Sequence, residues 1–316
     1  MSDSKTKVIS IYTNKGGTHK STTTANLAYC LTHNFNKKVL VIDMDPQANL
    51  SLMLNFDVFQ IGAAEAEGGV PTIASLLQQI VWYGNKPSIK DLQDTIISPT
   101  YRYNERKPKS IEWEVKEEKF GFDLIPGTTK DLSLIELAFM TGGNEDELPF
   151  ILQPEGRQYN RIVLKMLVDM IKKYFDYDYI LIDNPPSLGI LAIMSLCASD
   201  ATISPVVPDF LALVGLKTVV DNLGDLQQFT NNYNILGILL SGYNSNKLND
   251  EEIKKLIEDD EQFADVPIFN TMIPERRAAR KYNMEDRIPA QVKGDLQDAY
   301  IRLAEEVIER IEVKWQ

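Results

Sequence analysis

The sequence predicts an α/β fold with a doubly wound, mostly parallel sheet flanked by helices. The first observation is that short apolar runs, suited to buried strands, alternate along the chain with stretches of helical periodicity. The second is that three of these runs end in polar loops, at residues 13–19, 43–47 and 183–187. Strands interleaved with helices form a parallel sheet, and ligands bind at the carboxyl ends of such strands.

Composition indicates a folded globular protein. The chain has 316 residues, of which 44% are hydrophobic, enough for the core of one large α/β domain or two small ones. We expect one domain over residues 1–316, with an insertion of uncertain structure at about 56–120 that contains a hairpin or flexible segment. The net charge of −12 argues against a surface coated in positive charge for nucleic acid, but it allows a local basic patch.

The two cysteines, Cys30 and Cys197, lie inside apolar, helix-like stretches, as expected of small core residues in a reduced compartment. The N-terminus lacks the apolar block of a signal peptide, and no later stretch is long enough to span a bilayer. We therefore expect a cytoplasmic protein with no membrane partner.

The first apolar run, residues 8–12, leads into Asn-Lys-Gly-Gly-Thr-His-Lys-Ser-Thr at 14–22 and then into a helix-like stretch. A strand, loop and helix in this order form a cradle for phosphate, because loop N–H groups turn inward and the helix adds its positive dipole end. Lys20 would reach the β- and γ-phosphates, and the Ser21 hydroxyl would hold Mg²⁺. Asn14 and His19 replace the glycines of the ordinary pattern, so a turn without a ligand is the alternative.

The second and third strands both end in carboxylates. Asp43 and Asp45 stand two residues apart after the apolar run 39–42, so the period of a strand places both side chains on one side of its end. A solvated turn is the alternative there, since Asp and Pro are common turn residues. The apolar run 179–182 likewise ends in Asp183.

Together these segments resemble the ParA/MinD family of ATPases, which have a P-loop NTPase-like fold. Residues 15–22 resemble the deviant Walker A box Lys-Gly-Gly-x-x-Lys-[Ser/Thr]-Thr, residues 43–47 the Walker A′ element, and residues 183–186 the Walker B element. The order of the three along the chain is far more specific than any one of them. The resemblance covers nearly the whole chain except the insertion at about 56–120.

The resemblance implies ATP and Mg²⁺ as cofactors and gives the residues roles. Lys15 would cross a dimer interface to the partner's nucleotide, and Asp45 would position the attacking water. Asp43 would lie near Mg²⁺, and Asp183 would hold it through water opposite Ser21. The implied ATP-binding residues are Lys15, Gly16, Gly17, Thr18, His19, Lys20, Ser21, Thr22, Pro208 and Asn244. The last two resemble adenine contacts, although Asn after a strand is also ordinary turn chemistry. The family usually has glycine at the position of His19, a departure that bears on loop geometry and hydrolysis rate.

A short basic segment, Glu-Arg-Arg-Ala-Ala-Arg-Lys at 275–281, concentrates positive charge in this acidic protein. Helical spacing places Arg276 with Arg280, and Arg277 with Lys281, on shared faces. One interpretation is a surface helix paired with nearby acidic residues. Because the family uses basic residues around this region for sequence-independent DNA binding, we favour contacts with DNA phosphates.

The resemblance implies a short ParA-type partition ATPase that is slow until a partner stimulates it. ATP and Mg²⁺ would assemble a homodimer that binds non-specific DNA on the nucleoid, and a ParB-like adaptor on a plasmid or chromosome would trigger hydrolysis. The alternatives are a positioning ATPase for a protein cargo such as a microcompartment, and a metabolic amidoligase-like ATPase of the same superfamily. The acidic final helix, at 296–313, argues against a MinD-like membrane anchor.

Overall fold

A parallel sheet organises the protein, and it confirms the predicted fold class. The computed structural model describes residues 6–56, 71–106, 113–141, 161–208, 234–244, 266–275 and 288–314, with residues 252, 255, 257 and 259. Within these residues the main sheet has seven strands in the order β5-β2-β6-β1-β7-β8-β9, and all its pairings are parallel. Its strands are β1 (Lys7–Ile11), β2 (Val39–Asp43), β5 (Asp123–Ile125), β6 (Tyr179–Asp183), β7 (Ala201–Val206), β8 (Asn234–Tyr243) and β9 (Ile273–Pro274).

The register of the central strands brings the polar loops together. Asp43, the last residue of β2, is the direct partner of Asp183, the last residue of β6. Ile11, the last residue of β1, also pairs with Asp183. The carboxyl ends of β2, β6 and β1 therefore lie side by side, at the edge of the sheet where ligands of α/β proteins bind.

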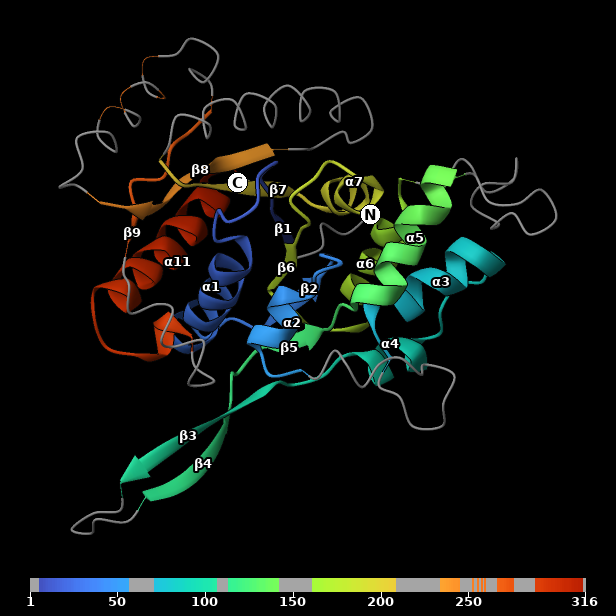
Figure 1. Cartoon of the computed structure of the whole chain (residues 1–316), viewed down its shortest axis with the longest axis horizontal. Coiled ribbons are helices and arrows are strands. Elements are labelled where there is room, and N and C mark those ends of the chain that lie inside the picture. The colour runs from blue at the N-terminus through green and yellow to red at the C-terminus, as the bar shows by residue number, and fades with distance from the viewer. Residues whose placement is uncertain are drawn as a thin grey trace.

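Helices cover both faces of the sheet, and Figure 1 shows α1 and α11 on one side with α3, α5, α6 and α7 on the other. Each side has its own apolar core. The helices are α1 (Lys20–Phe35), α2 (Asn49–Met53), α3 (Ile73–Tyr83), α4 (Ile89–Thr95), α5 (Thr129–Thr141), α6 (Val163–Tyr174), α7 (Ile190–Ala198) and α11 (Asp295–Lys314), with a 3-10 turn, η4 (Pro289–Gln291). None of the described helices is both long enough and apolar enough to cross a membrane.

The last helix, α11, packs its apolar positions into the core, as the sequence predicts. Leu303 and Val307 are fully buried, and the helix lies against α1. On a neighbouring position Glu306 accepts hydrogen bonds from the backbone N–H groups of Asn270 (2.8 Å) and Thr271 (2.9 Å), and from Arg310 (2.7 Å). These bonds attach α11 to the segment between β8 and β9.

The described part of the insertion contains α3, α4 and an antiparallel hairpin of β3 (Thr100–Arg106) and β4 (Trp113–Lys119). The hairpin projects from the body of the protein (Figure 1). Near its base the hydroxyls of Tyr101 and Tyr103 donate to Glu118 at 2.6 and 2.7 Å, and Tyr101 packs on Phe120. The sequence predicts either a hairpin or a flexible segment here, and the structure contains a hairpin.

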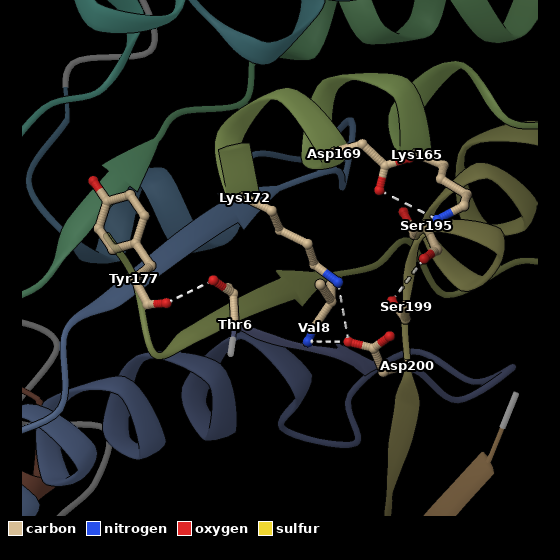
Figure 2. A network of polar contacts seen from close by, with 9 residues as sticks. All are labelled: Thr6, Val8, Lys165, Asp169, Lys172, Tyr177, Ser195, Ser199 and Asp200. Atoms are coloured by element: carbon tan, nitrogen blue, oxygen red, sulfur yellow. Dashed lines mark hydrogen bonds and ion pairs between the residues drawn. The ribbon is translucent and has the colours of Figure 1, made fainter. Parts of the chain in front are cut away.

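At the amino-terminal edge of the sheet, opposite the ligand-binding edge, a network of polar contacts connects β1 with the segments before β6 and β7 and with α6 (Figure 2). The carboxylate of Asp200, at the start of β7, accepts from the Val8 N–H at 2.8 Å and from Lys172 of α6 at 3.3 Å. Thr6 donates to the carbonyl of Tyr177 at 2.7 Å. These bonds attach the start of β1 to the segments that precede β6 and β7.

Both cysteines are buried free thiols, as expected of core residues. Burial raises the pKa of Cys30 to about 12, so its thiol stays protonated and unreactive.

Candidate functional site

In the loop between β1 and α1, two side chains donate hydrogen bonds to one backbone carbonyl of the same loop. The Lys20 ammonium donates to the carbonyl of Lys15 at 3.0 Å, and the Thr18 hydroxyl donates to the same carbonyl at 3.4 Å. Gly17 has φ 74°, a left-handed conformation that side chains disfavour, which explains the glycine at this position. The result is a compact loop that leads directly into the first turn of α1.

A pocket of about 510 Å³ opens over this loop. It is lined by Gly16, Gly17, Thr18, His19, Lys20, Ser21, Thr22, Asp45, Gln47, Asn49, Leu52, Met53 and Pro186. The predicted phosphate loop, the second Asp of Asp-Met-Asp and the Pro-Pro segment after β6 therefore share one cavity. The α2 residues in its wall were not predicted from the sequence.

Lys20 is a buried cation in the wall of this pocket, with only 7% of its surface exposed. Burial lowers the pKa of its ammonium, while the carboxylates of Asp183 and Asp45 raise it. A lysine placed in this way can neutralise an anionic ligand such as a phosphate.

Asp183 is completely buried at the end of β6. Burial, and then the nearby Asp43, hold the pKa of its carboxyl well above the ordinary value. Its Oδ1 accepts from the Thr24 hydroxyl at 3.3 Å, whereas its Oδ2 has no hydrogen-bond partner among the described residues. A buried, unpaired carboxylate oxygen near Ser21 fits a hydrated divalent cation, which usually needs few protein ligands when substrate phosphates supply the rest. No group of three His, Cys, Asp or Glu side chains in the described ranges forms a complete metal site.

Asp43 is also completely buried, and burial raises its pKa to about 6. Its Oδ2 accepts from both the N–H (2.9 Å) and the hydroxyl (2.6 Å) of Ser51, and its Oδ1 accepts from the Asp45 N–H at 3.2 Å. Asp45 in turn accepts from the Gln47 N–H at 2.9 Å. Asp45 lines the pocket, whereas the oxygens of Asp43 are bonded to α2 and to the loop.

His19 occupies the glycine position of the loop in a left-handed conformation, φ 65° and ψ 27°. Its Nδ1 lies 3.1 Å from the hydroxyl of Ser241 on β8. Gly242, with φ 72°, makes room for the ring, because a Cβ there would lie 3.1 Å from His19 Cε1. The histidine is thus accommodated by an exposed loop position and by a glycine on β8, which is separated from β1 by β7.

The two predicted adenine residues lie at the same edge of the sheet. Pro208 is buried just after β7, and Asn244 follows β8 with its amide 3.5 Å from the Glu275 carboxylate. Neither lines the pocket described above. The predicted DNA-binding residues Arg276, Arg277, Arg280 and Lys281 lie outside the described residues.

Glu136 of α5 is a site neighbour that no sequence pattern indicated. A Cβ at Gly189 would lie 2.3 Å from Glu136 Oε1, so the glycine at the start of α7 allows this carboxylate to approach closely. Burial and the charge of Asp45 raise the pKa of Glu136. Its position depends on the packing of α5 against α7, which is not visible in the sequence.

A strand-loop-helix cradle with a buried lysine, beside carboxylates at the carboxyl edge of a parallel sheet, defines a P-loop nucleotide-binding protein. A family model described as an AAA domain matches residues 6–235. The chain belongs to the ParA/MinD family of P-loop ATPases.

Relatives of known name agree on this assignment. The chain is 30% identical over 273 residues to the sporulation initiation inhibitor protein Soj of Bacillus subtilis, covering 85% of this chain and 84% of Soj. It is 28% identical over 315 residues to the chromosome partitioning protein ParA of Caulobacter vibrioides, covering 98% and 97% of the two chains.

Two solved structures share the fold. The McdA protein of Cyanothece, solved as a variant in complex with ATP, has a TM-score of 0.69 at 20% identity, covering 98% of this chain and 97% of that one. Cobyrinic acid a,c-diamide synthase from Mycobacterium smegmatis, with a bound ATP analogue and magnesium, has a TM-score of 0.68 at 22% identity, covering 97% and 96%.

Proposed function

We propose that the protein is a ParA-type ATPase that hydrolyses ATP with Mg²⁺, dimerises when ATP is bound and positions a cargo on non-specific DNA. The observation that carries the proposal is the pocket in which Lys20, Ser21 and Asp45 meet. Its volume and its buried cation suit a nucleotide polyphosphate.

Each residue has a physical role in this proposal. Lys20 neutralises the β- and γ-phosphates, and Ser21 with Asp183 would hold Mg²⁺. The metal, when bound, supplies positive charge against the phosphates. Asp45, in the pocket wall, orients the attacking water, and Lys15 reaches the nucleotide of a partner subunit. Turnover is slow in the isolated protein, because a stimulating partner completes the arrangement.

Partition of DNA is favoured over other roles by the relatives and by local charge. The ParA protein that the chain resembles is a chromosome partitioning protein. The basic residues at 276–281 supply phosphate contacts in a protein whose net charge of −12 otherwise repels DNA. A ParB-like adaptor, bound to a plasmid or chromosome site, then stimulates hydrolysis and release.

Two alternative functions come from solved structures that are about equally similar to this chain. McdA and cobyrinic acid a,c-diamide synthase have TM-scores of 0.69 and 0.68, so the fold does not distinguish a positioning ATPase for a protein cargo from an amidoligase. The amidoligase-like function predicts ATP turnover that depends on a small carboxylic acid and is indifferent to DNA.

Lys20→Ala and Lys15→Ala test the nucleotide site. Lys20→Ala should abolish ATP binding in isothermal titration calorimetry, since the buried cation that faces the phosphates is lost. Lys15→Ala should keep most of the binding but lose the ATP-dependent dimer in light scattering. An ATP-dependent dimer of normal size in Lys15→Ala would contradict the role of Lys15 across the interface.

A further inference from the structure

Ser51, on the inner face of α2, joins three parts of the site through one hydroxyl. The side chain is fully buried. Its Oγ donates to Asp43 Oδ2 at 2.6 Å and accepts from the Gly127 N–H at 2.9 Å. The Ser51 N–H donates to the same oxygen of Asp43 at 2.9 Å. The end of β2, the helix α2 and the loop after β5 are therefore held together at this residue.

These bonds determine what Asp43 can do. Its Oδ2 is bonded twice by Ser51, and its Oδ1 accepts from the Asp45 N–H at 3.2 Å. Both oxygens are directed to the protein's own groups, in contrast to Oδ2 of Asp183, which has no partner among the described residues. Asp43 thus connects Ser51 to the backbone of Asp45, the residue that lines the pocket.

Helix α2 depends on this connection for its position. It has five residues, too few to be stable by itself, and it starts after Ala48 in a left-handed conformation at φ 49°. Its outer face supplies Asn49, Leu52 and Met53 to the pocket wall. On the other side, a Cβ at Gly127 would lie 2.8 Å from the Asp43 carbonyl oxygen, so only glycine allows the loop to reach the Ser51 hydroxyl.

We propose that Ser51 is a positioning residue for hydrolysis: it fixes Asp43, and Asp43 fixes Asp45 at the pocket wall. Asp43 then belongs to the framework of the site rather than to the contacts of Mg²⁺. This inference rests on the proposed ATPase function and deepens it.

The first test compares Ser51→Ala with Ser51→Thr, which keeps the hydroxyl. Ser51→Ala should lower kcat about 10- to 100-fold, the effect of losing one hydrogen bond to a charged group, with KM for ATP nearly unchanged. Ser51→Thr should retain most of the wild-type kcat. Equal kcat for Ser51→Ala and wild type would overturn the proposal, as would an equal loss in the two variants.

The second test measures the Mg²⁺ concentration at half-maximal ATP binding by isothermal titration calorimetry. Asp183→Asn should raise this midpoint about tenfold or more, since one pairwise charge contact is lost. Ser51→Ala and Asp43→Asn should leave it within about twofold, a change equivalent to about 0.4 kcal/mol. If Ser51→Ala or Asp43→Asn shifted the midpoint as much as Asp183→Asn does, Ser51 and Asp43 would act by binding Mg²⁺, and the proposal would be wrong.

A third readout needs no nucleotide and separates this inference from the ATPase proposal. In the free protein, amide hydrogen exchange over residues 43–51 should be faster in Ser51→Ala, because the Asp45 N–H loses a fixed acceptor. Exchange over residues 179–183, which form a central strand, should stay the same. Unchanged exchange over 43–51 would overturn the role of Ser51, whereas failure of wild-type protein to bind ATP would refute only the proposed function.

Discussion

Glu306→Gln should destabilise the protein measurably, because the carboxylate of Glu306 attaches α11 to the segment between β8 and β9. It accepts from the N–H groups of Asn270 and Thr271 and from Arg310, at 2.8, 2.9 and 2.7 Å. Glutamine keeps one acceptor oxygen but presents an NH₂ group to a second donor. The residue is only 9% exposed, so water replaces the lost bonds poorly.

The expected loss at neutral pH is about 2 kcal/mol, since hydrogen bonds to charged groups contribute about 1.5 to 3 kcal/mol each. Burial by itself raises the pKa of Glu306, but the two N–H groups and Arg310 outweigh it and lower the pKa below the ordinary value. The stabilisation is therefore complete above the unfolded pKa of about 4.3, and it is lost as the pH falls through the folded pKa. The difference between wild type and Glu306→Gln should shrink in the same acidic range.

Urea denaturation of both proteins from neutral to acidic pH measures this difference. Glu305→Gln is the matched control, because Glu305 is the exposed neighbour on the same helix and loses the same charge. The control should change the free energy of unfolding by less than about 0.5 kcal/mol. A Glu306→Gln protein as stable as the control at neutral pH, or a difference that is independent of pH, would refute the reasoning.

Two further predictions concern the pocket. Asp45→Ala should bind ATP and dimerise but hydrolyse ATP at least about 100-fold more slowly, because no side chain would orient the attacking water. A wild-type rate in a phosphate-release assay would rule out this role of Asp45. His19→Gly should leave the protein folded, since glycine adopts the left-handed conformation of this position without strain. It should weaken ATP binding several-fold, because the contact between the loop and Ser241 is lost; identical affinity in calorimetry would show that His19 is a neutral substitution.

The sequence predicts the fold class and much of the pocket because the signals are local. Apolar runs such as 39–42 form buried strands, and a parallel sheet places the carboxyl ends of such strands at one edge, so the sequence predicts that Asp43 and Asp183 share that edge. Their direct pairing depends on β2 lying beside β6. Helix ends are predicted less well. Helix α1, for which the sequence predicts only an approximate end, continues to Phe35, where Asn36 adopts a left-handed conformation that closes the helix.

Contacts between distant segments could not be predicted. Gly127 reaches Ser51 only because β5 lies beside β2 in the sheet, and His19 reaches Ser241 only because the loop crosses towards β8. A serine in a short helix and a glycine after a strand have many ordinary explanations when the sheet order is unknown. The place of Asp43 was also underdetermined, since the spacing gives its side of the strand but not its hydrogen-bond partners.

In the proposed function, ATP controls binding to DNA. The most direct measurement is fluorescence anisotropy of a random-sequence duplex with ATP, ADP or no nucleotide, across a salt series. Binding should require ATP, because the proposed dimer would bring two basic segments to one DNA duplex, and log K should fall by roughly 0.9 per log unit of salt for each phosphate neutralised. Arg276→Glu with Arg280→Glu should eliminate it, whereas the control pair Lys293→Glu with Arg302→Glu, which changes two exposed basic residues outside the 275–281 segment, should not. Equal binding in all three nucleotide states would show that ATP does not control binding to DNA.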